Sequence, residues 1–328
     1  MCVHPHTVEY DQCVREIAEY TREIASGRAT APTWLKRGMW LQQMSELAGA
    51  VRDYDRAEAR AAELSLDELA RLHNLRGVCY RRTLMSEQAL RDLTRAVELR
   101  PERGLYWSNL GVARYFAGQI EPALADLNRS LELDDKNERT WETRAMCHQK
   151  LANHAQAVAD FGRAFEIEGE ALPLAYAQRA HSYLMLGCYD EAIADCDHGE
   201  RLDSHEESFE IYRVRGVARY AQGDPDAALG DLSRAISLKS DFEELYLLRG
   251  LVYRALGDAA AAADDLTEYA KRHPTGAPQA LAHIANMMHA FTPDENFIRE
   301  STRIYARGFV DGGIVLSASR RMPPADAA

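Results

Sequence analysis

The fold is indicated by a six-residue sequence, LRGVCY at residues 75–80, which returns along the chain in altered form. Each copy carries a small residue at the same place: Gly38, Gly77, Gly111, Ala145, Ala180, Gly216 and Gly250. Consecutive small residues are 39, 34, 34, 35, 36 and 34 positions apart, and an alanine follows each of them after twelve residues. Such a period predicts stacked helix pairs, because one pair cannot bury its apolar face alone.

The composition is that of a folded, non-membrane protein. The chain has 328 residues, of which 46% are hydrophobic and 27% charged, and its net charge of −12 disfavours nucleic-acid binding. No stretch approaches the roughly 20 apolar residues of a membrane span. The first residues lack the cationic and apolar parts of a secretory signal, and the six cysteines are dilute. We therefore expect a cytoplasmic protein without a nucleic-acid or membrane partner, and the sequence leaves the oligomeric state open.

The repeat resembles the tetratricopeptide repeat (TPR) family, whose units are helix–turn–helix pairs of 34 residues. With the small residue at repeat position 8 and the alanine at position 20, position 4 is aromatic in six copies: Trp34, Trp107, Trp141, Tyr176, Tyr212 and Tyr246. The resemblance implies an all-α fold, a right-handed superhelix (α-solenoid) of seven units over residues 31–276.

The ends of the chain are predicted to cap the stack. Residues 1–30 contain one amphipathic helix at 7–25, with Val14, Ile17 and Ile24 expected on its buried side. Residues 277–310 are expected to form a divergent eighth helix pair. Residues 311–328 are expected to form a flexible tail.

Opposite charges recur in step with the repeat. Position 7 is arginine in six of the seven units, at Arg37, Arg76, Arg144, Arg179, Arg215 and Arg249, with Leu110 as the exception. Position 23 is aspartate in all seven, at Asp53, Asp92, Asp126, Asp160, Asp195, Asp231 and Asp265. We predict an arginine–aspartate spine between packed helices, since a guanidinium suits bidentate contact with a carboxylate. The alternative is a row of anion-binding arginines.

The resemblance also implies which residues face the concave surface. The family's groove positions hold eight basic and three acidic residues here, although the whole chain is acidic. The candidate binding residues are Lys36, Arg71, Asn74, Arg81, Arg82, Asn109, Tyr115, Arg139, Lys150 and Tyr220. They predict a scaffold that binds an acidic protein or peptide segment. The alternative is an ordinary solvated helix face. The two-carboxylate clamp of the family's chaperone-binding members is not matched, since Thr143 replaces its arginine.

Signatures of chemistry are missing from the sequence. It has no phosphate-binding loop, no dinucleotide-binding glycine motif, no nucleophile elbow and no zinc-protease helix, so we predict no catalytic residue, metal or cofactor. Cys196 and His198 lie two apart on a helix and cannot readily share an ion. His181 is expected on the concave face as a polar contact. An enzyme or small-ligand receptor stays open as the alternative function, as does a regulator whose own residues 314–316 dock into the groove.

Overall fold

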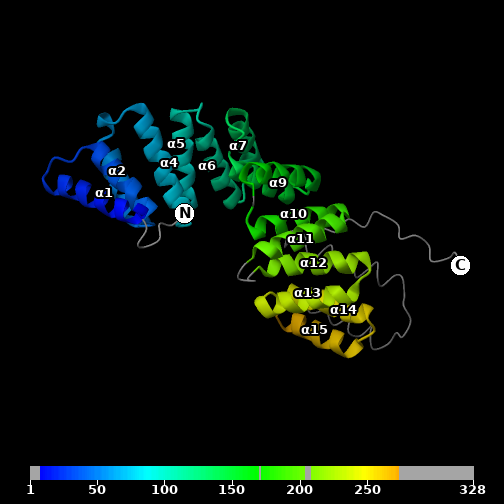
Figure 1. The fold of residues 1–328 in the computed structure, drawn as a ribbon. Helices are drawn as coiled ribbons and strands as arrows, with labels where there is room; N and C mark the ends of the chain where they lie inside the picture. Colours follow the sequence, from blue (N-terminus) through cyan, green and yellow to red (C-terminus); the bar gives the residue numbers. More distant parts are fainter. Residues whose placement is uncertain (1–7, 170, 204–207, 273–328) are drawn as a thin grey trace. The chain divides into compact units, whose positions relative to one another are not determined.

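Figure 1 shows the computed structural model, which describes residues 8–169, 171–203 and 208–272. Its elements are α1 (Val8–Ala25), α2 (Ala31–Gln43), α3 (Leu47–Glu58), the 3-10 helix η1 (Ala61–Glu63), α4 (Leu66–Arg82), α5 (Ser86–Leu99), α6 (Gly104–Phe116), α7 (Ile120–Leu133), α8 (Glu138–Lys150), α9 (His154–Glu168), α10 (Pro173–Leu186), α11 (Tyr189–Leu202), α12 (Phe209–Gln222), α13 (Pro225–Leu238), α14 (Glu244–Ala255) and α15 (Ala259–Arg272). The predicted all-α class is confirmed. None of these helices is both long enough and apolar enough to cross a membrane.

The chain divides into two compact units, residues 1–147 and 148–328. In unit 1 the helices pack as the pairs α2/α3, α4/α5 and α6/α7, and in unit 2 as α10/α11, α12/α13 and α14/α15. The first helices of neighbouring pairs also contact one another, as α2–α4–α6 in unit 1 and α10–α12–α14 in unit 2. Each unit is therefore an α-solenoid segment in which the first helices form one continuous row. The predicted cap at 277–310 and the tail lie outside the described residues.

The small residues at position 8 allow the two helices of a pair to approach closely. A Cβ atom added at Gly77 would lie 2.7 Å from Cγ of Leu93, and one added at Gly111 would lie 2.7 Å from Cγ of Leu127. Both leucines are fully buried. A larger residue at either position would force the helices apart and open the core.

Helix α1 packs on α2 with Ile17 and Ile24 on the expected side, but with Cys13 there in place of Val14. Cys13 is fully buried, and Ile17 and Ile24 are half-buried on the same side. Val14 is 44% exposed, so its predicted place on the buried side was wrong. Residues 13, 17 and 24 follow the spacing of one helical stripe, and residue 14 lies about 100° around the helix from residue 13.

Candidate functional site

The arginines at position 7 pair with the aspartates at position 23. In five repeats guanidinium nitrogens donate to both carboxylate oxygens at 2.6 to 3.2 Å: Arg37–Asp53, Arg76–Asp92, Arg179–Asp195, Arg215–Asp231 and Arg249–Asp265. These aspartates are buried. The pair Arg144–Asp160 would join residues of different units and stays a prediction. Because carboxylates of their own repeats occupy these five arginines, they form a structural spine and not a row of free anion sites.

The remaining nitrogen of a spine arginine reaches the preceding helix pair. Nη1 of Arg76 donates to Oδ1 of Asp55 at 2.7 Å, and Nη1 of Arg215 donates to Oδ1 of Asp197 at 2.7 Å. The acceptors of such bonds share repeat position 25: Asp55, Asn128, Asp197 and Ser233. Each of these arginines therefore connects its own repeat to the second helix of the previous one. This link joins two repeats and does not follow from the arginine–aspartate spacing within one repeat.

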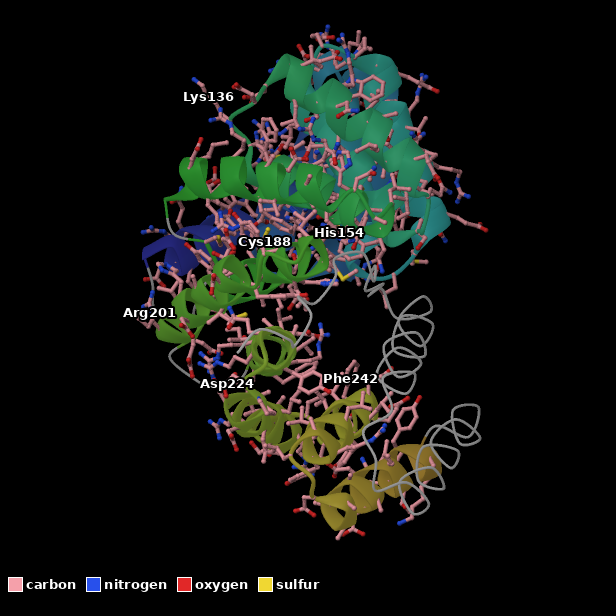
Figure 2. All side chains as sticks on the ribbon, turned by 90° about the vertical axis from the view of Figure 1, so that its right-hand side faces the viewer. Lys136, His154, Cys188, Arg201, Asp224 and Phe242 are labelled. Atoms are coloured by element: carbon pink, nitrogen blue, oxygen red, sulfur yellow. The ribbon has the colours of Figure 1, made fainter. Side chains whose placement is uncertain are left out.

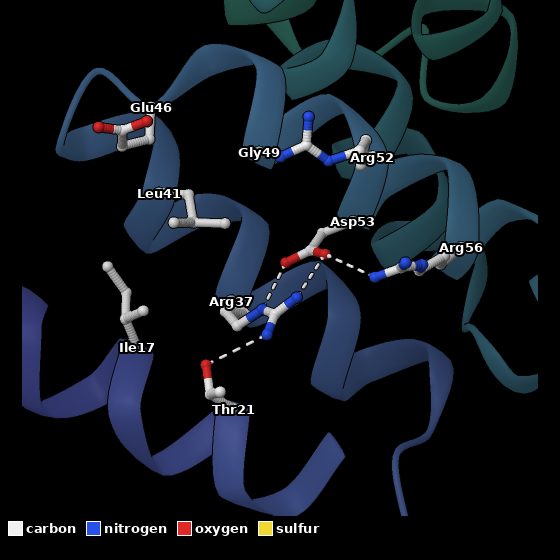
Figure 3. A pocket seen from close by; sticks show the side chains of 9 residues that line it. All are labelled: Ile17, Thr21, Arg37, Leu41, Glu46, Gly49, Arg52, Asp53 and Arg56. Atoms are coloured by element: carbon white, nitrogen blue, oxygen red, sulfur yellow. Dashed lines mark hydrogen bonds and ion pairs between the residues drawn. The ribbon is translucent and has the colours of Figure 1, made fainter. Parts of the chain in front are cut away.

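The first repeat has no preceding pair, and α1 takes that place. Nη1 of Arg37 donates to Oγ1 of Thr21 at 3.1 Å, while Asp53 accepts from the other two nitrogens of Arg37 (Figure 3). These side chains help to line a recess of about 400 Å³. Its central charges already satisfy one another, so this recess is a weak candidate for a ligand site.

The spine changes partner where Leu110 replaces the arginine. Nη1 of Arg114, one helical turn further along α6, donates to both oxygens of Asp126 at 2.8 Å. Burial raises the pKa of Asp126 to about 6, and Arg114 offsets this effect only in part. Arg219 occupies the same repeat position and donates to Asp231 at 2.7 Å. The arginine four residues after position 7 was the sequence feature from which this change of ion-pair partner could have been predicted.

Three arginines of unit 1 differ from the spine. Arg81 and Arg82 end α4, and Arg139 lies near the start of α8; we call them the arginine cluster. None has a carboxylate within ion-pair distance among the residues that the structure describes. Nη2 of Arg82 donates to Oγ of Ser45 at 3.3 Å. The predicted groove residues of unit 1 thus include three cations without counter-charge.

Within the arginine cluster, Arg81 has the least favourable surroundings for a positive charge. Its Nε is buried without a hydrogen-bond partner, and its guanidinium lies 5.9 Å from the ring centroid of Phe116. Burial lowers the pKa of Arg81, and the like charges of Arg139 and Arg82 lower it further. Contact with the ring of Phe116 compensates only in part for the hydration that the Arg81 guanidinium loses on burial. An incoming anion would therefore interact with Arg81 more strongly than with a fully hydrated arginine.

The two predicted asparagines bind one another. Nδ2 of Asn109 donates to Oδ1 of Asn74 at 2.8 Å, which links α6 to α4. Asn74 is buried, whereas Asn109 keeps part of its surface exposed. Asn109 is therefore the amide of this pair that solvent reaches.

The other candidates of unit 1 extend the same row of first helices. Lys36 on α2 and Arg71 on α4 are exposed. Tyr115 is half-buried and packs edge-on against Phe116, with ring centroids 5.3 Å apart. Phe116 is 64% exposed. Unit 1 thus presents cations beside an accessible aromatic ring.

Comparison with known proteins identifies the repeat. Residues 244–276 match the family model described as tetratricopeptide repeat. This segment of the chain therefore matches the tetratricopeptide repeat. No curated protein matches the whole sequence significantly.

Solved structures share the fold at low sequence identity. The APC/C hetero-tetramer Cut9–Hcn1 matches with a TM-score of 0.62 and 15% identity over 84% of this chain. A TPR protein from Parabacteroides merdae matches with a TM-score of 0.55 and 18% identity over 79% of this chain and 98% of its own. PilF from Pseudomonas aeruginosa matches with a TM-score of 0.54 and 16% identity over 64% of this chain and 94% of its own. This chain spans 52% of the length of the first of these structures.

Unit 2 holds the last two candidates. Lys150 is exposed at the end of α8, and Tyr220 is 39% exposed near the end of α12. Arg213, also on α12, donates through Nε to Oε2 of Glu210 at 2.7 Å, so a counter-charge is already present there. The basic character that the sequence predicted for the groove is therefore clearest in unit 1.

Cys196 belongs to the core of unit 2. Cys196 is fully buried, and burial raises the pKa of its thiol above the usual range. Asp195 beside it is occupied by Arg179. Cys196 therefore serves core packing, and Asp195 belongs to the spine.

Proposed function

We propose that this TPR protein is an interaction scaffold that binds an acidic segment of a partner protein on the first-helix row of unit 1. TPR stacks present extended surfaces to protein partners. The arginine cluster carries the proposal, because none of its three cations has a carboxylate partner in the described ranges, whereas the spine arginines do. A glutamate or aspartate side chain of the partner would supply the missing counter-charge.

Arg81 is expected to contribute most of the binding energy of the cluster. Its guanidinium is partly dehydrated whether or not a ligand is present, so that part of the dehydration cost is already met before binding. Hydrogen bonds to charged groups contribute about 1.5–3 kcal/mol each. Asn109 could add a hydrogen bond to the backbone of an extended segment.

A labelled octaglutamate peptide tests the proposal by fluorescence anisotropy on the full chain. We expect the double variant Arg81→Glu/Arg82→Glu to bind at least about tenfold more weakly than the parent. Binding to the parent should also weaken as salt concentration rises. The matched control is Arg95→Glu/Arg129→Glu, which makes the same charge change at exposed arginines on the second helices α5 and α7. Equal weakening in both variants, or in neither, would contradict the proposed site.

A further inference from the structure

Two histidines contact each other in unit 2 outside the spine and the core. His154 is the first residue of α9 and is labelled in Figure 2, and His181 lies on α10. Their ring centroids are 6.0 Å apart and the ring planes are nearly perpendicular, at 88°. In each ring Nδ1 is buried and has no hydrogen-bond partner among the described residues. Both side chains nevertheless keep some exposed surface.

The charged side chain that acts on His181 is Arg213, which is itself bound to Glu210. Helix α10 packs against α9, α11 and α12. His154 faces His181 from α9 and Arg213 faces it from α12, while no titratable group of α11 in the described residues acts on it. Arg213 uses Nε and Nη2 for Glu210, which leaves its Nη1 without an acceptor in the described part of the chain. This nitrogen of Arg213 could donate to an anion.

Both rings are uncharged at neutral pH. Burial lowers the pKa of His154. Burial lowers the pKa of His181 to about 3, with smaller contributions from Arg213 and His154. A bound anion would raise the pKa of both histidines, because an opposite charge within contact distance favours the protonated ring. The start of α9 adds unpaired backbone N–H groups, since the side chain of Asn153 does not cap it.

We propose that His154, His181 and Arg213 form an anion site in unit 2, for carboxylate or phosphate oxygens, whose occupancy is coupled to proton uptake by the histidine pair. The site shares no residue with the arginine cluster and does not depend on it. By linkage, the affinity for the anion rises as pH falls, by up to about tenfold per pH unit for each proton taken up.

Side-chain NMR of the full-length protein with ¹⁵N-labelled histidine tests the site in the wild type. The titrations compare sodium chloride with sodium sulfate at equal ionic strength between about pH 5 and pH 8, because sulfate does not titrate in this range. In chloride His181 should stay neutral throughout. In sulfate the apparent pKa of His181 should rise by about two units or more, from about 3 into the titrated range. His73 of unit 1, whose Nδ1 lies 3.0 Å from Oδ1 of Asp92, is the internal control and should not respond.

The octaglutamate peptide replaces sulfate in a second arm. A shift with the peptide alone assigns the ligand to carboxylates of a partner, and a shift with sulfate as well assigns the site to oxyanions in general. Identical titrations in chloride, sulfate and peptide would overturn the proposal, as would an equal shift at His73. Failure here leaves the proposal for the arginine cluster unaffected, because that proposal is tested by variants of Arg81 and Arg82 in unit 1.

A pair of variants separates the site from general charge effects. Arg213→Gln should abolish most of the sulfate-dependent shift of His181. Arg201→Gln is the matched control, because Arg201 also lies beside a histidine, with its Nη2 3.3 Å from Nδ1 of His198, but outside the site. Equal responses in the two variants would show that Arg213 has no specific part in the site.

Discussion

Asp92 and Asp126 occupy the same position of neighbouring repeats but differ in their electrostatics. Burial acts to raise the pKa of Asp92, but hydrogen bonds from Arg76 and His73 lower it below its usual range. Asp126 receives a single nitrogen of Arg114, and burial raises its pKa to about 6. Two guanidinium nitrogens and an imidazole therefore offset the burial of the Asp92 carboxylate. The single nitrogen of Arg114 does not fully offset the burial of Asp126.

The raised pKa of Asp126 predicts an unusual pH dependence. The folded chain holds this proton more tightly than the unfolded chain, whose aspartate titrates near 3.8. The stability from Asp126 is therefore fully present below about pH 4 and is lost as pH rises through about 6. We expect Asp126→Asn to remove this loss and to raise the free energy of unfolding by about 1–2 kcal/mol at pH 7.5. Denaturant unfolding between pH 4 and pH 8 measures the effect.

The control is the same substitution at the other aspartate. Asp92 has a lowered pKa, so its stabilisation is present above about pH 4 and is lost as pH falls. Asp92→Asn leaves the buried Arg76 without its full partner and should cost about 3 kcal/mol at pH 7.5. Similar losses in the two variants would contradict the difference drawn between the two sites.

At the scale of the helix pair, the turn between helices imposes one backbone conformation. Position 15 has a positive φ in every repeat, and four repeats place glycine there: Gly118, Gly187, Gly223 and Gly257. Leu84 occupies this position with φ 61° and is 88% exposed. A leucine in this region is strained and gains little from burial.

Leu84→Gly should therefore stabilise the protein. We expect a gain of about 0.5–1 kcal/mol, because relief of the left-handed conformation exceeds the extra entropy of glycine in the unfolded chain. Chemical denaturation followed by circular dichroism measures it. Ala125→Gly, at an exposed position inside α7, should instead cost about 1 kcal/mol. A loss of stability in Leu84→Gly would contradict the turn argument.

At the scale of the molecule, each unit is a stack in which the spine joins neighbouring repeats. Arg215 connects α12 to α13 through Asp231 and to α11 through Asp197. The stability of such stacks is a sum of repeat and nearest-neighbour contributions. A change in one spine residue should therefore act on the repeats that it joins.

Hydrogen exchange with mass spectrometry checks this locality. We expect Arg215→Met to accelerate exchange in α11, α12 and α13, since it leaves Asp231 buried with only Arg219 as partner. Exchange in α4 and α5 should be unchanged. Arg201→Met, an exposed substitution on α11, is the control and should change none of them. Uniform acceleration in every helix would show that the chain unfolds as one cooperative body.

Much of the fold follows from residues that are near one another in the sequence. The small residue at position 8, the alanine at position 20 and the paired Arg76 and Asp92 act within one repeat, where the short turn leaves the second helix few arrangements. Period and spacing were therefore sufficient to predict the helix pairs and five arginine–aspartate contacts. Period and spacing also predicted that the arginines of the cluster lie on the first-helix row, but they could not predict that these arginines have no carboxylate partner in the described part of the chain.

The remaining features depend on how the chain brings distant residues together. The link from Arg76 to Asp55, the bond between Asn109 and Asn74, and the contact of His154 with His181 each cross from one repeat to another. A periodic sequence defines the face of a helix and its partner within the pair. The rotation and offset of one pair on the next come from packing of the whole stack, so only the folded chain decides which polar groups meet and which cations stay without a carboxylate.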